Sequence, residues 1–368
     1  MLPSAPKSLG RLGEVLISAL YSTLGVTNPL NLVAKRSVCV ILVDGLGLHN
    51  LKGAAAHAGF LNSVQSEAAM CWFPATTATS LTSFATSSNP STNGFLGYQV
   101  FNEATQAPMN LLSGWTNFEA GSSYQELPTI AEQATESNVA FHTIASAAYE
   151  RSGFTGATMR GSFFHGLNNI SDRFLKAKQL LKDSEAKVVY LYIPELDQIA
   201  HAKGFSSIEW LNELEAIDAQ VRVLSADLPK FSGIVVTADH GVVDVEKANH
   251  IYIDELIPSE QFRFVGGDTR ALYLYFKNNA IAQNRALLEE KLGDSCYIVT
   301  TAELIAAGYF QTLSAASANV APDLFVLARK KVALYHRDFA KVKSLQMVGH
   351  HGSITNEELA IPLIKIGF

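Results

Sequence analysis

The sequence predicts an α/β fold, with a mostly parallel central sheet, helices on both faces of that sheet, and a smaller α+β insertion. Three continuous apolar runs, at residues 38–43, 188–193 and 233–237, have the β-branched composition of buried parallel strands. An amphipathic helical pattern over residues 208–224 separates the second run from the third, which makes a βαβ unit with a right-handed crossover. Each run is followed by an acidic residue, as expected where parallel strands end at the ligand-binding edge of a sheet.

The composition places the chain among soluble globular proteins. It has 368 residues, of which 48% are hydrophobic and 17% are charged, with a formal net charge of -6. Without a Lys/Arg block, we expect no nucleic acid polymer as a partner. Because no apolar stretch approaches the ~20 residues of a membrane span and no signal peptide is apparent, we expect a cytoplasmic protein that does not bind membranes.

The domain organisation follows from the order of these patterns. Residues 1–36 have apolar positions at helical spacing and predict an N-terminal helical extension. We expect residues 37–241 and 346–368 to form the α/β core, with residues 242–345 as a partly inserted, cap-like α+β region. The alternating segment at residues 270–276 predicts a strand within that insertion.

The first apolar run ends in Asp44-Gly45-Leu46-Gly47. A nucleotide-binding glycine fingerprint would place a third glycine at position 50, where the chain has Asn50. A plain nucleotide-binding module is therefore the weaker interpretation. The alternative is that Asp44 is a metal ligand and that Gly45 allows the chain to turn away sharply.

The next feature is a segment at residues 73–86 that is dense in small hydroxyl residues. Pro74 and the threonines Thr76 and Thr77 are typical of a helix start, where threonine can cap. A hydroxyl at a helix N-terminus beside a metal ion can attack a bound phosphate. A small-residue helix packed on the sheet is the simpler alternative. The following residues 91–94 predict a loop.

Residues 95–186 carry weaker signals. A helix is expected at residues 124–137 and a strand at residues 139–144. Five side chains of this region could reach a substrate, although an ordinary structural role is the better expectation for each: Trp115, Tyr149, Arg151, Arg160 and His165.

The second and third apolar runs lead into acid and histidine pairs. After the second run, Asp197 and His201 are four residues apart, which places both on one face of a helical turn. The third run leads into Asp239 and His240. If the runs are parallel neighbours, their acids meet at one edge of the sheet.

Two more histidines occur late in the chain, at His350-His351-Gly352, before residues 359–366 predict a last strand. One of these two histidines, together with the earlier residues, makes a set of three carboxylates and three imidazoles. These ligands suffice for two divalent ions ~4 Å apart, which could clamp a phosphoryl group. Mixed Asp and His ligation suits zinc, our preferred ion, or manganese.

The order of these motifs resembles the alkaline phosphatase superfamily, and within it the type I phosphodiesterase/nucleotide pyrophosphatase family. The motifs are Val-Asp-Gly, Pro-Ala-Thr-Thr-Ala-Thr-Ser, Glu-Leu-Asp-Gln-Ile-Ala-His, Thr-Ala-Asp-His-Gly and His-His-Gly. The resemblance runs from about Val38 to His351 and therefore covers most of the chain.

The resemblance implies a ligand set for each ion. One ion, which also contacts the nucleophile, would be held by Asp44, Asp239 and His240. The other would be held by Asp197, His201 and His351. In this family the last histidine directly precedes a glycine, which favours His351 over His350.

The resemblance also implies the nucleophile, which in this family lies ten residues before the glycine of a Thr-Gly pair. The corresponding pair here is Thr86-Ser87, which indicates Thr77, with Thr76 as the alternative. Tyr98 stands where the nucleotide pyrophosphatases usually have a phosphate-binding asparagine. The sulfatase branch is disfavoured because no Cys-x-Pro-x-Arg or Ser-x-Pro-x-Arg motif occurs.

The resemblance implies a two-metal hydrolase that cleaves phosphodiester or nucleotide pyrophosphate bonds of a small phosphate ester. The reaction would pass through a covalent phospho-threonine. The alternatives on the same scaffold are a phosphomonoesterase, a phosphonate hydrolase and a phosphomutase. A metal-binding protein without catalysis is a further alternative from another class.

Overall fold

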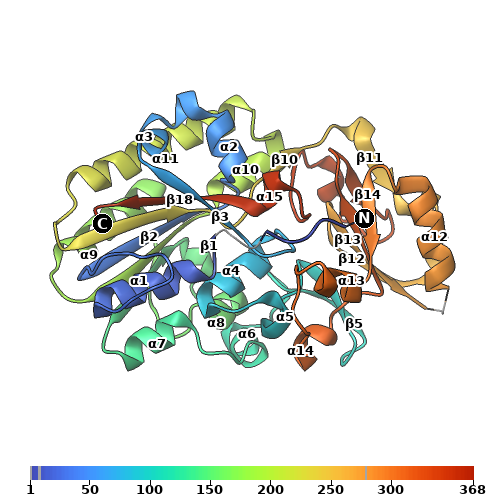
Figure 1. The fold of residues 1–368 in the computed structure, drawn as a ribbon, viewed down its shortest axis with the longest axis horizontal. Helices are drawn as coiled ribbons and strands as arrows, with labels where there is room; N and C mark the ends of the chain where they lie inside the picture. The colour runs from blue at the N-terminus through green and yellow to red at the C-terminus, as the bar shows by residue number, and fades with distance from the viewer. Residues whose placement is uncertain (1, 7–9, 278–279) are drawn as a thin grey trace.

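The computed structural model describes residues 2–6, 10–277 and 280–368, and a large central sheet dominates it (Figure 1). The sheet has eight strands in the order β1-β3-β18-β9-β2-β8-β6-β7. In that order the strands are β1 Gly10–Arg11, β3 Ser66–Met70, β18 Ala360–Ile366, β9 Ser232–Thr237, β2 Ser37–Val43, β8 Lys187–Ile193, β6 Ala140–Ala145 and β7 Phe163–Gly166.

The three apolar runs form the centre of this sheet. Strand β2 pairs in parallel with both β8 and β9, so that Ile41 lies opposite Leu191 on one side and Val236 on the other. Every residue of β2 is buried, as continuous apolar runs require when helices cover both faces of a sheet. The predicted parallel neighbours are confirmed.

The last strand, β18, runs against its neighbours. It lies between β9 and β3 and is antiparallel to both, with Ile364 opposite Val236 and Ile361 opposite Ala69. The strand predicted at residues 359–366 is therefore confirmed, and it joins the two parts of the sheet.

Helices cover both faces of the sheet, as predicted (Figure 1). Below the sheet in this view lie α1 Glu14–Leu24, α4 Thr77–Thr86, α7 Ile130–Glu136 and α8 Gly153–Thr158, with α6 Phe118–Tyr124 against α8. The other face carries α2 Leu48–Gly53, α3 Gly59–Ser63, α10 Glu195–Lys203 and α11 Ile208–Ala226, with α9 Ile170–Lys182 against α11. No helix among the described residues has both the length and the apolar character that crossing a bilayer requires.

Two local predictions were wrong. The single helix expected at residues 124–137 is interrupted, because α6 ends at Tyr124 and α7 begins only at Ile130. Pro128 precedes a capping box in which Thr129 and Glu132 bond to each other's backbone N–H groups, and this box sets the start of α7.

The loop expected at residues 91–94 is instead largely a one-turn helix, α5 Pro90–Asn93. Its N-cap, Asn89, accepts a hydrogen bond from the Ser91 N–H, and Pro90 occupies the first helical position. The helix ends at Gly94, whose φ of 81° is left-handed.

A second, antiparallel sheet lies beside the first (Figure 1). Its strands, in order, are β12 Phe262–Asp268, β13 Ala271–Phe276, β15 Leu324–Ala328 and β14 Cys296–Val299. The helices α12 Ile281–Leu292, α13 Thr301–Ala306 and α14 Ala315–Ala318 belong to the same stretch of chain, and α15 Asn356–Leu359 directly precedes β18. Short strands form three pairs: β4 Gln99–Asn102 with β5 Ala107–Asn110, β10 Val243–Asp244 with β17 Gly349–His350, and β11 His250–Tyr252 with β16 Ala333–Tyr335.

Candidate metal centre

The strand ends bring the predicted acids to one edge of the central sheet. Asp44 directly follows β2, and Asp239 lies two residues beyond the end of β9. Asp197 is in the first turn of α10, which begins almost directly after β8. Because these three strands are parallel neighbours, their acids converge although they are far apart in the chain.

The first group of ligand atoms comes from Asp44, Asp239 and His240, which lie within 4.8 Å of one another. The Nε2 atom of His240 is 3.5 Å from Oδ1 of Asp44 and 3.4 Å from Oδ2 of Asp239. The other oxygen of Asp239 accepts a hydrogen bond of 3.1 Å from the Gly45 N–H, which fixes the orientation of the carboxylate.

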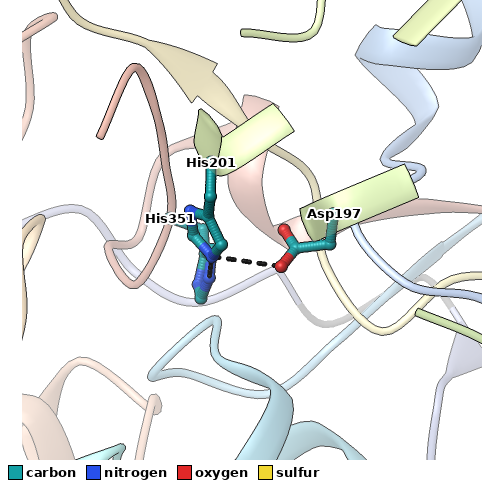
Figure 2. Close-up of side chains that lie close together, drawn as sticks. All are labelled: Asp197, His201 and His351. Atoms are coloured by element: carbon teal, nitrogen blue, oxygen red, sulfur yellow. Dashed lines mark hydrogen bonds and ion pairs between the residues drawn. The ribbon is translucent and has the colours of Figure 1, made fainter. Parts of the chain in front are cut away.

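The second group comes from Asp197, His201 and His351, whose ligand atoms also lie within 4.8 Å of one another (Figure 2). The Nε2 atom of His201 is 3.0 Å from Oδ2 of Asp197 and 3.3 Å from Nε2 of His351. The spacing of four residues on α10 thus places an acid and a histidine on one face of the helix, as the sequence predicted.

The two groups form one site. The rings of His240 and His351 are stacked with centroids 3.8 Å apart. A histidine of the first group is therefore in direct contact with a histidine of the second group. His350 takes no part in either group, because its Nδ1 atom lies 2.8 Å from Oγ1 of Thr269.

All three histidines of the site direct Nδ1 at a backbone carbonyl. His201 Nδ1 is 2.9 Å from Gly349 O, and His351 Nδ1 is 2.8 Å from Ala75 O. His240 Nδ1 lies 3.3 Å from the carbonyl oxygen of the next residue. Donation of Nδ1–H to a carbonyl fixes the tautomer and leaves Nε2 free to bind a metal.

The buried carboxylate oxygens also fit a metal site. Among the described residues, Oδ1 of Asp44, Oδ1 of Asp197 and Oδ2 of Asp239 are buried without a hydrogen-bond partner. Burial, together with the neighbouring carboxylates, raises the pKa of Asp44 and of Asp239. Divalent cations would satisfy these oxygens and offset the repulsion, so the residues present fit two metal ions.

Thr77 lies against the first group. It is the first residue of α4, and its Oγ1 atom is 3.2 Å from Nε2 of His240. Thr76 is the N-cap residue of that helix, but its side chain makes no capping hydrogen bond. The capping role expected for a threonine at this helix start is therefore wrong, whereas the helix start itself is confirmed.

A cavity of about 520 Å³ opens beside the two groups. Its wall includes Thr77 and the predicted ligands Asp44, Asp197, His201 and His351. Tyr98, at the position where the resemblance implies an asparagine in the nucleotide pyrophosphatases, also lines this cavity.

Two residues of the site had no signal in the sequence. The Tyr192 hydroxyl donates a hydrogen bond to Oδ2 of Asp44, but the sequence presents Tyr192 only as part of an apolar strand. Asp268 lines the cavity from the end of β12 in the second sheet. It follows no strand of the central sheet, so strand-end reasoning could not find it.

The five side chains considered between residues 95 and 186 divide into two sets. Tyr149 lines the main cavity and an adjoining cavity of about 400 Å³, and Trp115 and Arg151 line the adjoining one. Arg160 forms an ion pair with Glu132 at 2.9 Å and bonds to backbone carbonyls. His165 lies on the edge strand β7, where its Nε2 atom is 3.0 Å from Nδ1 of His142 on β6.

Comparison with protein families gives one match over residues 38–354, to the model of type I phosphodiesterase/nucleotide pyrophosphatase. A search of curated protein sequences found no match.

Solved structures with a similar fold include murine ectonucleotide pyrophosphatase/phosphodiesterase 5, with a TM-score of 0.67 and 15% sequence identity. An inactive threonine-to-alanine variant of the murine protein in complex with AMP has a TM-score of 0.68 and 14% identity, and the human protein has 0.70 and 13%. Each comparison covers 89% of this chain and 87% of the other. The predicted fold class is confirmed.

Proposed function

This chain belongs to the type I phosphodiesterase/nucleotide pyrophosphatase family, a family of metal-dependent hydrolases, and from that premise we propose the chemistry of its site. The chain hydrolyses phosphodiester or nucleotide pyrophosphate bonds at two divalent ions, with Thr77 as the nucleophile. The observation that carries the proposal is the position of the Thr77 hydroxyl, 3.2 Å from His240, at the edge of two Asp/His groups.

Each metal ion has its own set of ligands in this proposal. Asp44, Asp239 and His240 hold the ion nearer Thr77, and the second is held by Asp197, His201 and His351. Divalent ions in such a site lower the pKa of hydroxyl groups and offset the charge that develops on phosphoryl oxygens. Zinc suits the mixed oxygen and nitrogen donors, and manganese is the alternative.

The proposed reaction then proceeds in two steps, an attack by Thr77 and an attack by water. The Thr77 oxygen bonds to phosphorus as its proton is lost to solvent, the bond to the leaving oxygen breaks, and that oxygen takes up a proton. A phospho-threonine results in which phosphorus still carries the remaining ester group of the substrate. Water then attacks phosphorus, and the bond to Thr77 breaks. This second step releases a phosphate monoester and restores the threonine hydroxyl.

Nucleotides are a suitable substrate class. The murine structural neighbour is inactive as a threonine-to-alanine variant and binds AMP, which supports a catalytic threonine and a nucleotide ligand here. The cavity of about 520 Å³ and its neighbour of about 400 Å³ share Leu112, Tyr149 and Tyr192, so space for a nucleotide adjoins the ligand groups.

Replacement of Thr77 tests this proposal. Thr77→Ala should lower the turnover of a bis-aryl phosphate by about 10³-fold or more, while elemental analysis shows an unchanged metal content. Thr77→Ser keeps a hydroxyl and should retain much of the activity. Thr76→Ala tests the alternative nucleophile in the same way, and full activity of Thr77→Ala would assign the nucleophile elsewhere.

The same assay separates the alternative reactions. Rates on a bis-aryl phosphate, an aryl phosphate and an aryl phosphonate are compared side by side for the metal-loaded protein. A preference for the bis-aryl phosphate supports the proposed reaction. Bound metal without turnover of any of these esters would contradict it and would indicate a metal-binding protein that does not catalyse.

A further inference from the structure

One carboxylate of the metal cavity belongs to neither group of ligands. Asp268 lines the same cavity as Thr77 and the two groups, but it is a member of neither. Among the described residues its Oδ2 atom is buried without a hydrogen-bond partner, and no lysine or arginine forms an ion pair with it. Lys341 and Lys343 line the cavity as well, but neither bonds to Oδ2 of this carboxylate.

The chain holds Asp268 in place through a tight hairpin between β12 and β13. Asp268 pairs with Ala271 across the turn, and Gly267 before it has a φ of 81°. A Cβ atom at Gly267 would lie 2.1 Å from the carbonyl oxygen of Ala271, so only glycine fits this bend. The next residue, Thr269, bonds to His350 through Oγ1 at 2.8 Å. The hairpin is thus fastened to the strand that precedes His351.

Two neighbours show where Asp268 lies in the cavity. A Cβ atom built on Gly352, directly after His351, would lie 2.8 Å from the Cβ atom of Asp268. The Thr76 side chain lies close enough to favour the ionised form of Asp268, and Thr76 precedes the nucleophile Thr77. Asp268 therefore lines the cavity shared with Thr77 and His351 from the end of β12 in the second sheet.

The charge of this group follows from its surroundings. Burial raises the pKa of Asp268 to about 7, while Thr76, His201 and His240 act in the opposite direction. Divalent cations at the two ligand groups would stabilise the ionised form further. An ionised carboxylate without a cationic partner from the chain repels additional negative charge that enters the cavity.

We propose that Asp268 is a specificity-determining residue that disfavours doubly charged phosphate monoesters and so makes the site selective for singly charged phosphodiesters. The inference rests on the proposed function and deepens it. Both kinds of ester can be held by the metal ions, but the monoester dianion brings one more negative charge toward Asp268. This repulsion between Asp268 and the monoester dianion disfavours the monoester without adding a contact to the diester.

The experiment compares an aryl phosphate with a bis-aryl phosphate on the metal-loaded enzyme. Asp268→Asn keeps the size of the side chain and removes its charge. At about pH 8 we expect the monoester-to-diester ratio of kcat/KM to rise by about tenfold in this variant. Asp294→Asn, the same change at an exposed position of the second-sheet region, is the matched control and should leave the ratio within about twofold of wild type.

The pH dependence distinguishes a charge effect from a change of shape. The second ionisation of a phosphate monoester has a pKa of about 6, so near pH 5 the monoester carries one charge, like the diester. The ratio for Asp268→Asn should therefore approach the wild-type ratio near pH 5 and separate from it above pH 6. Asp268→Ser serves as a second variant, and unfolding curves and metal contents are matched before rates are compared.

Three outcomes bear on the inference. A ratio in Asp268→Asn and Asp268→Ser that equals wild type at every pH overturns it. A ratio that rises equally at every pH also overturns it, because an altered cavity shape would explain that result. Failure of the wild-type enzyme to hydrolyse any diester contradicts the proposed function instead, so the two failures are distinct.

Discussion

Each histidine of the candidate metal site directs one ring nitrogen at the backbone, and in His201 the other nitrogen pairs with Asp197, which governs how this residue responds to pH. Burial lowers the pKa of His201, but the adjacent Asp197 outweighs burial and raises it to about 9. In the metal-free protein His201 is therefore protonated at neutral pH and ion-paired with Asp197. A metal ion can bind only after that proton leaves.

The metal-free protein should lose stability as the pH rises from 7 to about 9. A raised pKa in the folded state gives stability that is complete below the ordinary value of 6.5 and is lost by about pH 9. We expect a loss on the order of 1–3 kcal/mol in the free energy of unfolding, measured by urea titration after chelation. Over the same range the affinity for zinc should rise.

Two variants check the source of that effect. His201→Gln should flatten the dependence of the unfolding free energy on pH. His142→Gln is the matched control, because the pKa of His142 is lowered to about 4 and this residue does not titrate between pH 7 and 9. An equally steep dependence in both variants would assign the effect to another group.

Single residues were predictable where they follow a strand or share a helix face. Asp44, Asp197 and Asp239 could be located because apolar strands end beside them. Asn50 shows the opposite case. The sequence presents it only as a missing glycine, but its side chain bonds to both the N–H and the carbonyl of Val242, which ties the turn after β2 to the loop after β9. A contact between residues so far apart in the chain leaves no local pattern.

Among the elements, helix α4 begins at the proposed nucleophile and ends in a strained conformation. Thr77 opens the helix beside the ligand groups, and Ser87 closes it with a left-handed φ of 52°. Glycine adopts this conformation without steric cost, whereas for other residues it raises the conformational free energy by roughly 1–2 kcal/mol. The family resemblance implies glycine at this position, and the structure explains why.

Ser87→Gly should raise the free energy of unfolding by about 0.5–1 kcal/mol. The relief of strain exceeds the extra entropy that glycine has in the unfolded chain. Thermal unfolding measures the effect, and kcat on the diester should be unchanged because Ser87 is exposed and outside the cavity. Ser87→Ala keeps the left-handed strain and should bring no gain. A stabilised alanine variant would contradict this account.

Elements with a strong hydrophobic period were predicted well, and those defined by caps were not. The run of small and polar residues from 124 to 137 resembles one helix, but Pro128 and the capping box at Thr129 divide it. A capping box requires two residues to bond to each other's backbone, which spacing can suggest but not establish.

For the molecule as a whole, a buried ion pair joins the second sheet to helix α15, which follows His351 in the chain. Arg270, directly before β13, donates to Glu358 in a bond of 2.9 Å, and both side chains are almost completely buried. Glu358 also accepts the Ser353 N–H at 2.8 Å, and its carbonyl accepts the Gly241 N–H. The pair therefore links three segments around the ligands.

Removal of one partner should be costly because the other is left buried and unpaired. Glu358→Ala should lower the free energy of unfolding by about 3–5 kcal/mol, measured by chemical denaturation of the metal-free protein. Arg270→Ala should cost a similar amount. The double variant should cost clearly less than the sum of the two, and strict additivity would show that the groups do not act as a pair.

The final strand has a consequence for how the protein is made. Strand β18 pairs with β9 and with β3, which lie about 130 and 300 positions earlier in the chain. Until residues 360–366 have been synthesised, β9 is an edge strand with unpaired backbone groups and apolar side chains. Such edge strands can pair with other chains. Biosynthesis of this enzyme thus includes an interval in which the half-built sheet is vulnerable to aggregation, and chaperones that shelter nascent polypeptides should improve its yield.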